Sequence, residues 1–294
     1  MGHTLYIECD SGISGDMTVG ALLDIGADSK KLLDVIDSIG EDAFKIEISK
    51  VKKAGLKCTD FNVILDDEHD GHDHDMDYLY GHLHEHGKEK HSHTHHNEHG
   101  EIEDLGHHHE HSEHEDLGHH HSHRGIKEIY DIIDNTSATE DAKKIAKRIF
   151  SVLAEAESKA HGVPVEEVHF HEVGAIDSIV DILAIGVCLD DLDITQVIVP
   201  KIFEGQGTVH CQHGILPIPV PAVVNIAAAH DIAMEILPVN GELVTPTGAA
   251  TIAAIRTSDT MPGQFVIKKV GMGSGKREYG LAGFLRVMII EEKE

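Results

Sequence analysis

The chain has 294 residues, with 52 Asp and Glu against 24 Lys and Arg, a formal charge of −28, and 27 His. Its length and its 40% hydrophobic content are typical of one large or two ordinary globular domains, and its acidity favours cationic partners over nucleic acids. Without an apolar run of roughly 18 to 20 residues or a signal peptide pattern, we expect no membrane partner and a cytoplasmic location. Four scattered cysteines without a CxxC pair exclude a disulfide framework, a zinc ribbon and a thioredoxin motif: Cys9, Cys58, Cys188 and Cys211.

The first 65 residues predict one strand, two helices and a hairpin. Residues 4–9 read as a strand, and a glycine-containing turn leads from it into helices at about residues 16–25 and 29–39. Alternating residues over 45–49 and 58–65 predict two paired strands around a turn at Lys53-Ala54-Gly55.

A His-rich segment interrupts the chain at residues 66–124. Residues 66–123 hold 20 of the 27 His and 17 Asp or Glu but only two Lys, and so carry −15 of the charge of −28. They contain hardly any branched or aromatic apolar side chains to offset the entropy of ordering the backbone, so we expect a disordered insert. Its clustered imidazoles suit many weak sites for Ni, Zn, Co or Cu, and a solvated linker without a role is the alternative. The accessory metal-binding candidates are His107, His108, His109, His119, His120 and His121.

Residues 125–294 complete a body with residues 1–65. The pattern predicts helices at 125–133, 140–161, 175–189, 222–230 and 247–256, and strands at 168–171, 196–203, 232–237, 264–270 and 283–290. Because strands and helices interleave irregularly, we predict an α+β fold with a mixed sheet and packed helices, and not a strict βαβ repeat.

The first of four motifs is a small-residue loop between the first strand and the first helix. Such a loop offers backbone N–H groups and the positive end of a helix to a phosphate or carboxylate. The nucleotide-binding candidates are Ser11, Gly12, Ser14, Gly15 and Asp16. Asp10 and Asp16 flank the glycines, where carboxylates hold a divalent ion against a phosphate. The loop matches neither Walker A nor GxGxxG, and a plain helix N-cap is the alternative.

The second motif joins paired histidines to an acidic apolar helix. His169 and His171 share one face if the segment is extended, and Asp177 and Asp181 share one face of the helix that follows. Apolar residues cover nearly the whole circumference of this helix, so it should be buried, and buried carboxylates need a cation, a basic partner or a cleft. With Glu172, these residues form a candidate mixed N/O site for Mn, Mg, Ni or Zn, while a cap and a structural ion pair are the alternative.

The third motif contains Cys211 and His213, two residues apart and on one side if extended. A thiolate and an imidazole suit nickel, zinc or copper, although a satisfied histidine beside a buried cysteine is the alternative. The proline-rich stretch that follows is too stiff for a central strand.

The fourth motif opens a helix with Thr245, Thr247 and Gly248, which suit a second anion cradle or a simple threonine cap. Near the end, Lys276 and Arg277 follow flexible glycines and offer two cations to an anionic ligand, as would a surface hairpin.

Taken together, four segments resemble the LarC family of nickel insertion proteins: SGISGDMTVGALLDIGAD, HFHEVGAIDSIVDI, HGILPIPVPA and GELVTPTGAA. The resemblance covers essentially the whole chain. It implies a nickel chelatase, a metal-inserting lyase, that places Ni(II) in a pyridinium bis-thiocarboxylic acid mononucleotide through metal–sulfur and metal–carbon bonds. CTP and Mn(II) or Mg(II) would be required, and the nickel-pincer nucleotide would serve lactate racemase and related enzymes.

The resemblance also suggests a role for each motif. The His-rich segment would collect nickel, the second motif would hold the inserting or activating cation, and the loop at Gly12 to Asp16 would bind nucleotide phosphate. His171 or Glu172 would take the proton that leaves the pyridinium ring carbon, with Asp16 as a further catalytic candidate. Cys211 and His213 would be transfer ligands for nickel.

Family members look as though they continue into a C-terminal domain associated with the cytidine nucleotide, whereas this sequence stops at Glu294. We therefore expect either a separate C-terminal partner chain or nickel binding without turnover. The rival hypotheses are a non-catalytic nickel store or delivery metallochaperone and a nucleotide hydrolase indifferent to nickel. A homo-oligomer is also expected.

Overall fold

The structure is a computed structural model that describes residues 2–41, 43–65, 124–170, 176–211 and 213–293. The His-rich segment of residues 66–123 lies outside the described residues, so the division into a body and an insert stays a prediction. None of the described helices combines the length and the apolar character of a membrane span.

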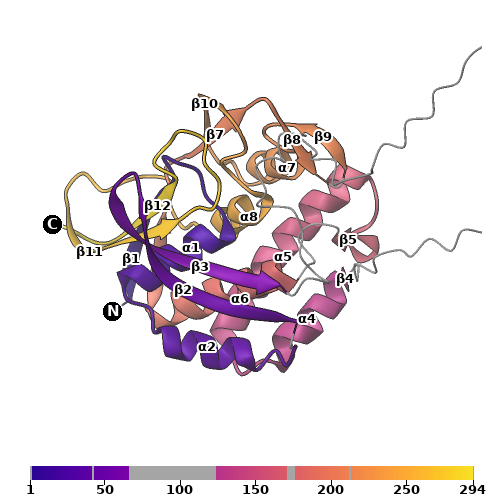
Figure 1. Cartoon of the computed structure of the whole chain (residues 1–294), viewed down its shortest axis with the longest axis horizontal. Helices are drawn as coiled ribbons and strands as arrows, with labels where there is room; N and C mark the ends of the chain where they lie inside the picture. The colour runs from indigo at the N-terminus through magenta and orange to yellow at the C-terminus, as the bar shows by residue number, and fades with distance from the viewer. Residues whose placement is uncertain (1, 42, 66–123, 171–175, 212, 294) are drawn as a thin grey trace, which may run out of the picture.

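The described residues alternate between strands and helices in an irregular order (Figure 1). The first half contains β1 (His3–Glu8), α1 (Gly15–Ile25), α2 (Ser29–Asp37), β2 (Phe44–Lys53), β3 (Leu56–Leu65), β4 (Arg124–Gly125), α4 (Ile126–Asn135), α5 (Glu140–His161), a short 3-10 helix (Val165–Glu167) and β5 (His169–Phe170). The second half contains α6 (Ile176–Asp191), β6 (Ile194–Ile198), β7 (Ile202–Gln206), β8 (Thr208–Cys211), β9 (Gly214–Pro217), α7 (Pro221–Ala229), β10 (Met234–Asn240), α8 (Pro246–Ile255), β11 (Phe265–Ser274) and β12 (Phe284–Glu292).

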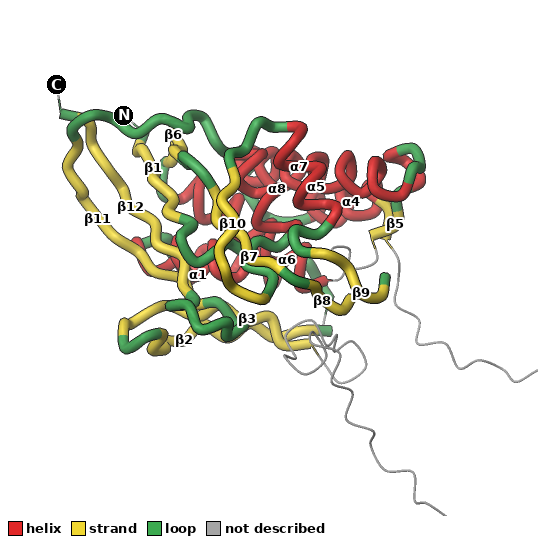
Figure 2. Tube along the Cα trace, turned by 90° about the horizontal axis from the view of Figure 1, so that it is seen from above, coloured by secondary structure: helices red, strands yellow, loops and turns green. Residues whose placement is uncertain are grey.

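The predicted α+β fold with a mixed sheet is confirmed. Six strands form one sheet in the order β2-β3-β11-β12-β1-β6, in which β1 pairs antiparallel with β12 and parallel with β6. Helices α4, α5, α7 and α8 lie together on one side of the molecule, and α1 lies between the sheet and α6 (Figure 2). The predicted hairpin is also confirmed, since Ala54 and Gly55 form its turn with φ of 49° and 79°, as a two-residue primed turn requires.

One prediction for the middle of the chain was wrong. Residues 196–203 were expected to form one strand, but β6 ends at Ile198 and β7 begins at Ile202, and the two belong to different sheets. Pro200 has no N–H for a ladder and separates them. The segment of the third motif forms a hairpin of its own, β8 and β9, with Cys211 opposite Gly214.

The predicted burial of the acidic helix is confirmed: in α6, Ile179, Val180 and all residues from Ile182 to Leu189 are buried. Helix α5 covers one side of it and α1 another. Asp177 and Asp181 therefore stand at the N-terminal end of this helix, which lines the cavity described below.

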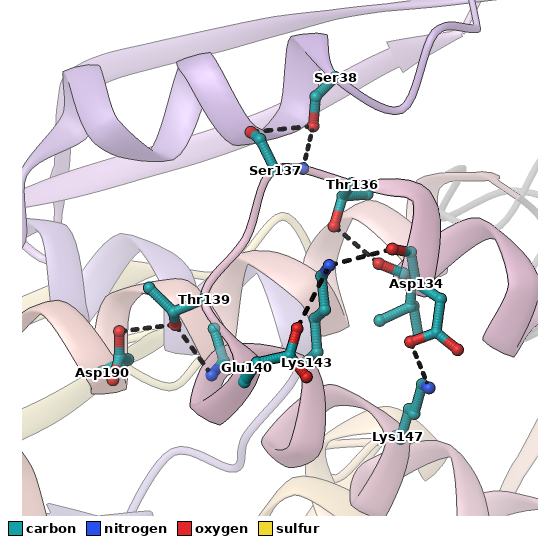
Figure 3. Close-up of polar contacts among 11 residues, drawn as sticks. Ser38, Asp134, Thr136, Ser137, Thr139, Glu140, Lys143, Lys147 and Asp190 are labelled. Carbon is teal, nitrogen blue, oxygen red and sulfur yellow. Dashed lines mark hydrogen bonds and ion pairs between the residues drawn. The ribbon is translucent and has the colours of Figure 1, made fainter.

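Polar contacts fix the connection between α4 and α5 against its neighbours (Figure 3). The Thr139 hydroxyl accepts the N–H of Ala142 and donates to Asp190 at 2.8 Å, so one side chain both caps α5 and ties it to α6. The N–H of Ser137 donates to the hydroxyl of Ser38 at 2.8 Å, which attaches the same connection to the end of α2. These contacts set the direction of α5, whose far end reaches the cavity.

Close packing of α1 on β11 gives the first testable prediction. A Cβ added at Gly273 would lie 1.9 Å from the carbonyl oxygen of Met17, whereas a Cβ at Gly263 would meet nothing within 4 Å. Because the obstacle is backbone, we expect Gly273→Ala to lower the free energy of unfolding by about 3 kcal/mol. Gly263→Ala should change it by less than about 0.5 kcal/mol. Urea unfolding measures both, and equal stabilities for the two variants would contradict this account of the packing.

Candidate functional site

All four motifs line one cavity of about 410 Å³. The N-terminus of α1, the C-terminus of α5, the start of α6, the β8–β9 hairpin and the residues after β11 enclose it. The predicted site residues on its wall are Ser14, Gly15, Asp16, Asp177, Asp181, Cys211, His213, Thr245 and Thr247. The sequence motifs, although far apart in the chain, therefore face a common space.

Three carboxylates crowd one end of this cavity, where α1 packs against α6. Asp181 accepts a hydrogen bond from the backbone N–H of Asp16, at the positive end of α1. Gly15 makes this approach possible, since a Cβ there would lie 2.5 Å from Oδ2 of Asp181. The carboxylate of Asp181 thus occupies part of the N-terminus of α1, where the sequence predicts a phosphate.

The acidic end favours a cation. Burial, and then the nearby charges of Asp16 and Asp177, raise the pKa of Asp181 well above its ordinary value, and Lys276 opposes this rise. Oδ2 of Asp16 and Oδ1 of Asp181 are buried and have no hydrogen-bond partner among the described residues. Buried acceptors that repel each other are stabilised by a hard divalent ion, which takes oxygen ligands.

The predicted metal group is placed only in part. Asp177 and Asp181 face the cavity and His169 lies on β5, while His171 and Glu172 lie outside the described residues. Over the described ranges, no three His, Cys, Asp or Glu side chains are arranged to hold a metal ion. Asp16 was predicted as a candidate of the first loop, and its position beside Asp177 and Asp181 was not, because only the α1–α6 contact brings it here.

The first loop is anchored to the chain before α8. The N–H of Ile13 donates to the carbonyl of Leu243 at 2.9 Å, and Gly12, with φ of 85°, packs so closely that a Cβ would lie 2.0 Å from the same oxygen. Gly12 therefore serves packing, and Ser11 lines a smaller adjoining pocket of about 70 Å³. Asp10 is exposed and lies outside the lining of both pockets.

At the start of α8 the structure shows the threonine cap, which was the alternative to a second anion cradle. The hydroxyl of Thr245 accepts the N–H of Gly248 at 3.1 Å, and a Cβ at Gly248 would lie 2.2 Å from the carbonyl oxygen of Ile13. Thr245 and Thr247 line the cavity, but Gly248 faces the first loop and is not part of the wall.

Two cations lie where the two pockets meet. Lys276 is 2.8 Å from both carboxylate oxygens of Asp60, and Arg277 pairs with Glu242. Both basic side chains are 18% exposed. Each therefore presents a positive charge to the cavity while a neighbouring carboxylate fixes its position.

The part of the cavity wall formed by the β8–β9 hairpin and the end of α5 carries nitrogen and sulfur. Cys211 and His213 lie on the β8–β9 hairpin, and the thiol of Cys211 donates to the carbonyl of Gly214 at 3.4 Å. Sequence reasoning missed three neighbours, His210, His161 and Glu157, which also line the cavity. The spacing of Glu157 and His161, one turn apart at the end of a predicted helix, is the signal that could have indicated two of them.

Sequence reasoning also missed Glu204, a fully buried carboxylate that holds the chain before α8. Its Oε1 accepts the N–H groups of Gly205 and Leu243, each at 2.7 Å, and of Val244 at 3.2 Å. Because Oε2 has no hydrogen-bond partner among the described residues, burial dominates and raises the pKa of Glu204 to about 7.

The fold and the site define an α+β protein whose cavity has an oxygen-rich acidic end and a nitrogen- and sulfur-containing end. Comparison with known proteins identifies the group. A family whose members are described as nickel insertion proteins matches residues 5–294, and the chain belongs to this family. The resemblance inferred from the four motifs is therefore confirmed.

Three relatives carry the name pyridinium-3,5-bisthiocarboxylic acid mononucleotide nickel insertion protein. The protein of Alkaliphilus metalliredigens is 46% identical over 292 residues, which are 99% of this chain and 61% of the relative. Those of Clostridium acetobutylicum and Acetivibrio thermocellus are 39% and 36% identical, over 98% and 99% of this chain and 64% and 61% of the relatives. The chain thus spans about three fifths of the length of these relatives. No solved structure matches it significantly.

The buried carboxyl of Glu204 is expected to make the free energy of unfolding depend on pH. The folded-state pKa of about 7 lies above the ordinary value of 4.5, so the folded state holds this proton more tightly than the unfolded state does. Its contribution is greatest below pH 4.5 and is lost as the pH rises toward about 7, by on the order of 3 kcal/mol in total.

We expect Glu204→Gln to remove this decline, measured as the free energy of unfolding in urea at pH 5 and pH 8. Glu235→Gln, which changes a half-exposed carboxylate on β10, should keep the wild-type dependence. An unchanged difference between the two pH values in Glu204→Gln would contradict the account.

Proposed function

We propose that this chain carries out nickel insertion into pyridinium-3,5-bisthiocarboxylic acid mononucleotide. The observation that carries the proposal is the convergence of all four family motifs on one cavity with two kinds of metal-binding side chain. The substrate named for its relatives supports the identity of the nucleotide. The chemistry is that of a chelatase-type lyase, and its product would be the nickel-pincer nucleotide used by lactate racemase-type enzymes.

In this reaction Ni(II) is a substrate. It forms bonds to the two thiocarboxylate sulfurs and to one ring carbon, whose proton leaves, and the oxidation state of nickel does not change. From the sequence, we propose that His171 or Glu172 is the base that accepts this proton, since a neutral imidazole or a carboxylate is a suitable base near neutral pH. Asp16, at the acidic end, is a further catalytic candidate.

We assign the acidic end to a hard activating ion, Mn(II) or Mg(II). The buried oxygens of Asp16 and Asp181 without hydrogen-bond partners, beside Asp177, are the ligand type that such ions prefer. A bound ion of this kind would supply positive charge that offsets the crowded carboxylates and a nearby phosphate. Cys211 and His213 carry the softer donors and are assigned to nickel.

We assign the phosphate of the nucleotide to the corner between the two pockets. Ser11, Ser14 and Thr245 provide hydroxyl groups there, and Lys276 and Arg277 provide positive charge. In this arrangement the pyridinium ring and its sulfur groups would extend into the larger cavity, between the acidic end and the hairpin.

We further propose that the reaction requires CTP and that a separate chain, equivalent to the remaining part of the relatives, takes part in that step. The assay therefore contains purified chain, the bis-thiocarboxylate nucleotide, Ni(II), Mn(II) and CTP, with and without such a partner chain. Mass spectrometry detects the nickelated product. A nickel-pincer-dependent racemase is the proposed recipient, and the chain is proposed to form a homo-oligomer.

Asp181→Asn tests the acidic end in this assay. We expect product formation to fall at least roughly tenfold, because the variant removes one charge from the cation site but keeps the shape of the side chain. Stability should not fall, since the change relieves repulsion with Asp16 and Asp177. Asp34→Asn, on the exposed face of α2, is the matched control and should keep wild-type activity. Equal activity of the two variants would remove the acidic end from the proposal.

A nickel store or delivery protein is the alternative function, and the His-rich segment is the observation that favours it. Replacing residues 66–123 by a short Gly/Ser linker separates the two functions. We expect insertion to survive when nickel is in excess and to decline when nickel is scarce, because the segment collects the metal. Loss of all function at excess nickel would favour the store, and product formation that ignores nickel would favour a nucleotide hydrolase.

A further inference from the structure

The end of α5 and the tip of the β8–β9 hairpin bring two imidazoles together. The ring centroids of His161 and His213 lie 5.1 Å apart, with an angle of 42° between the ring planes. One ring comes from the last residue of α5 and the other from the turn between β8 and β9. Both line the large cavity.

A carboxylate one helical turn earlier orients one of these rings. Oε2 of Glu157 lies 3.4 Å from Nε2 of His161. A carboxylate at one imidazole nitrogen favours the tautomer that carries its lone pair on the other nitrogen, as in carboxylate–histidine–metal arrangements. The negative end of α5 also favours a cation near His161.

A thiol completes the group. Cys211 is two residues from His213, on the same hairpin, and contributes to the same cavity wall. The other three cysteines are at most 1% exposed: Cys9 directly after β1, Cys58 on β3 and Cys188 on α6. Cys211 is therefore the cysteine of this chain that is placed to bond to a metal ion from solution.

We propose that Cys211, His213 and His161 form a capture site for a borderline divalent transition metal, with Glu157 orienting His161. The identity of the metal, Ni(II), rests on the proposed function. The three donors do not yet converge in the structure, so binding draws the hairpin tip toward the end of α5. The set of one thiolate and two imidazoles suits Ni(II), Co(II) and Zn(II), and not Mg(II).

The site would transfer Ni(II) to the nucleotide by ligand exchange. Cys211 loses its S–H proton when it binds the metal and regains a proton when the two thiocarboxylate sulfurs replace it, and nickel stays Ni(II) throughout. Because the capture site lines the cavity assigned to the nucleotide, the transfer would take place within that one cavity.

The test exploits the absence of cysteine from residues 66–123. The reduced full-length chain is titrated with Co(II) chloride and, separately, with Ni(II) sulfate, and the near-ultraviolet thiolate-to-metal charge-transfer absorption is recorded. Histidines of the His-rich segment compete for metal equally in all variants but give no such band. The wild type should develop the band, and Cys211→Ser should abolish it.

The remaining variants test the proposed partners. His161→Ala, His213→Ala and Glu157→Gln should each raise the metal concentration at half-development of the band by roughly tenfold or more. His3→Ala, at an exposed position on β1, should match the wild type. Circular dichroism verifies that each variant is folded.

Three results would overturn the site: no band in the wild type, a band that survives Cys211→Ser, or equal titrations of His161→Ala and His3→Ala. The insertion assay keeps the two proposals apart. A chain that inserts nickel without the band retains the proposed function and loses this site. A chain that shows the band but inserts no nickel retains the site and loses the proposed function.

Discussion

The contact between α1 and α6 is the constraint on which the rest of the site depends. It brings Asp181, which already has Asp177 one turn earlier on α6, onto the N-terminus of α1 and next to Asp16, where like charges repel and burial removes water. A single backbone N–H and the charge of Lys276 compensate only part of this cost. A fold that keeps such a cluster at the wall of a cavity, and not in its core, leaves it accessible to an ion that can neutralise it.

Glycines at a few contacts make this geometry rigid. Gly15 admits Asp181, Gly12 lies against Leu243, and Gly248 lies against Ile13, so that the first loop and the start of α8 touch through backbone atoms. Glu204 adds three backbone hydrogen bonds to the same region. Side chains on such a framework have little freedom, which the proposed substrate, with its three metal-binding atoms, would need.

Much of the fold follows from local pattern, and the arrangement of the site does not. The 140–161 helix has the predicted bounds because its apolar spacing, its Thr139 cap and its Gly162 C-cap agree. The strand over residues 196–203 fails because Pro200 outweighs apolar alternation. The sequence predicts Asp16 in an anion cradle and Asp181 on a buried helix as two separate features. The long-range contact between α1 and α6 joins them into one cluster, and no spacing in the sequence reveals this contact.

The acidic end offers hard oxygen donors, whereas the hairpin and the end of α5 offer softer nitrogen and sulfur donors. The arrangement of the softer donors helps to distinguish an insertion protein from a nickel store. A store gains from donors that already converge, because convergence slows release of the metal. Here the two imidazoles stand close, the described residues contain no finished site, and the thiol donates to a carbonyl of its own hairpin. Such a group binds a borderline ion less tightly than a preformed cage does, since part of the binding free energy is used to move the hairpin. In the proposed reaction, two thiocarboxylate sulfurs and a ring carbon on one rigid ligand would bear no such cost. The looseness of the protein donors would therefore set the direction of the proposed transfer, from the protein to the nucleotide.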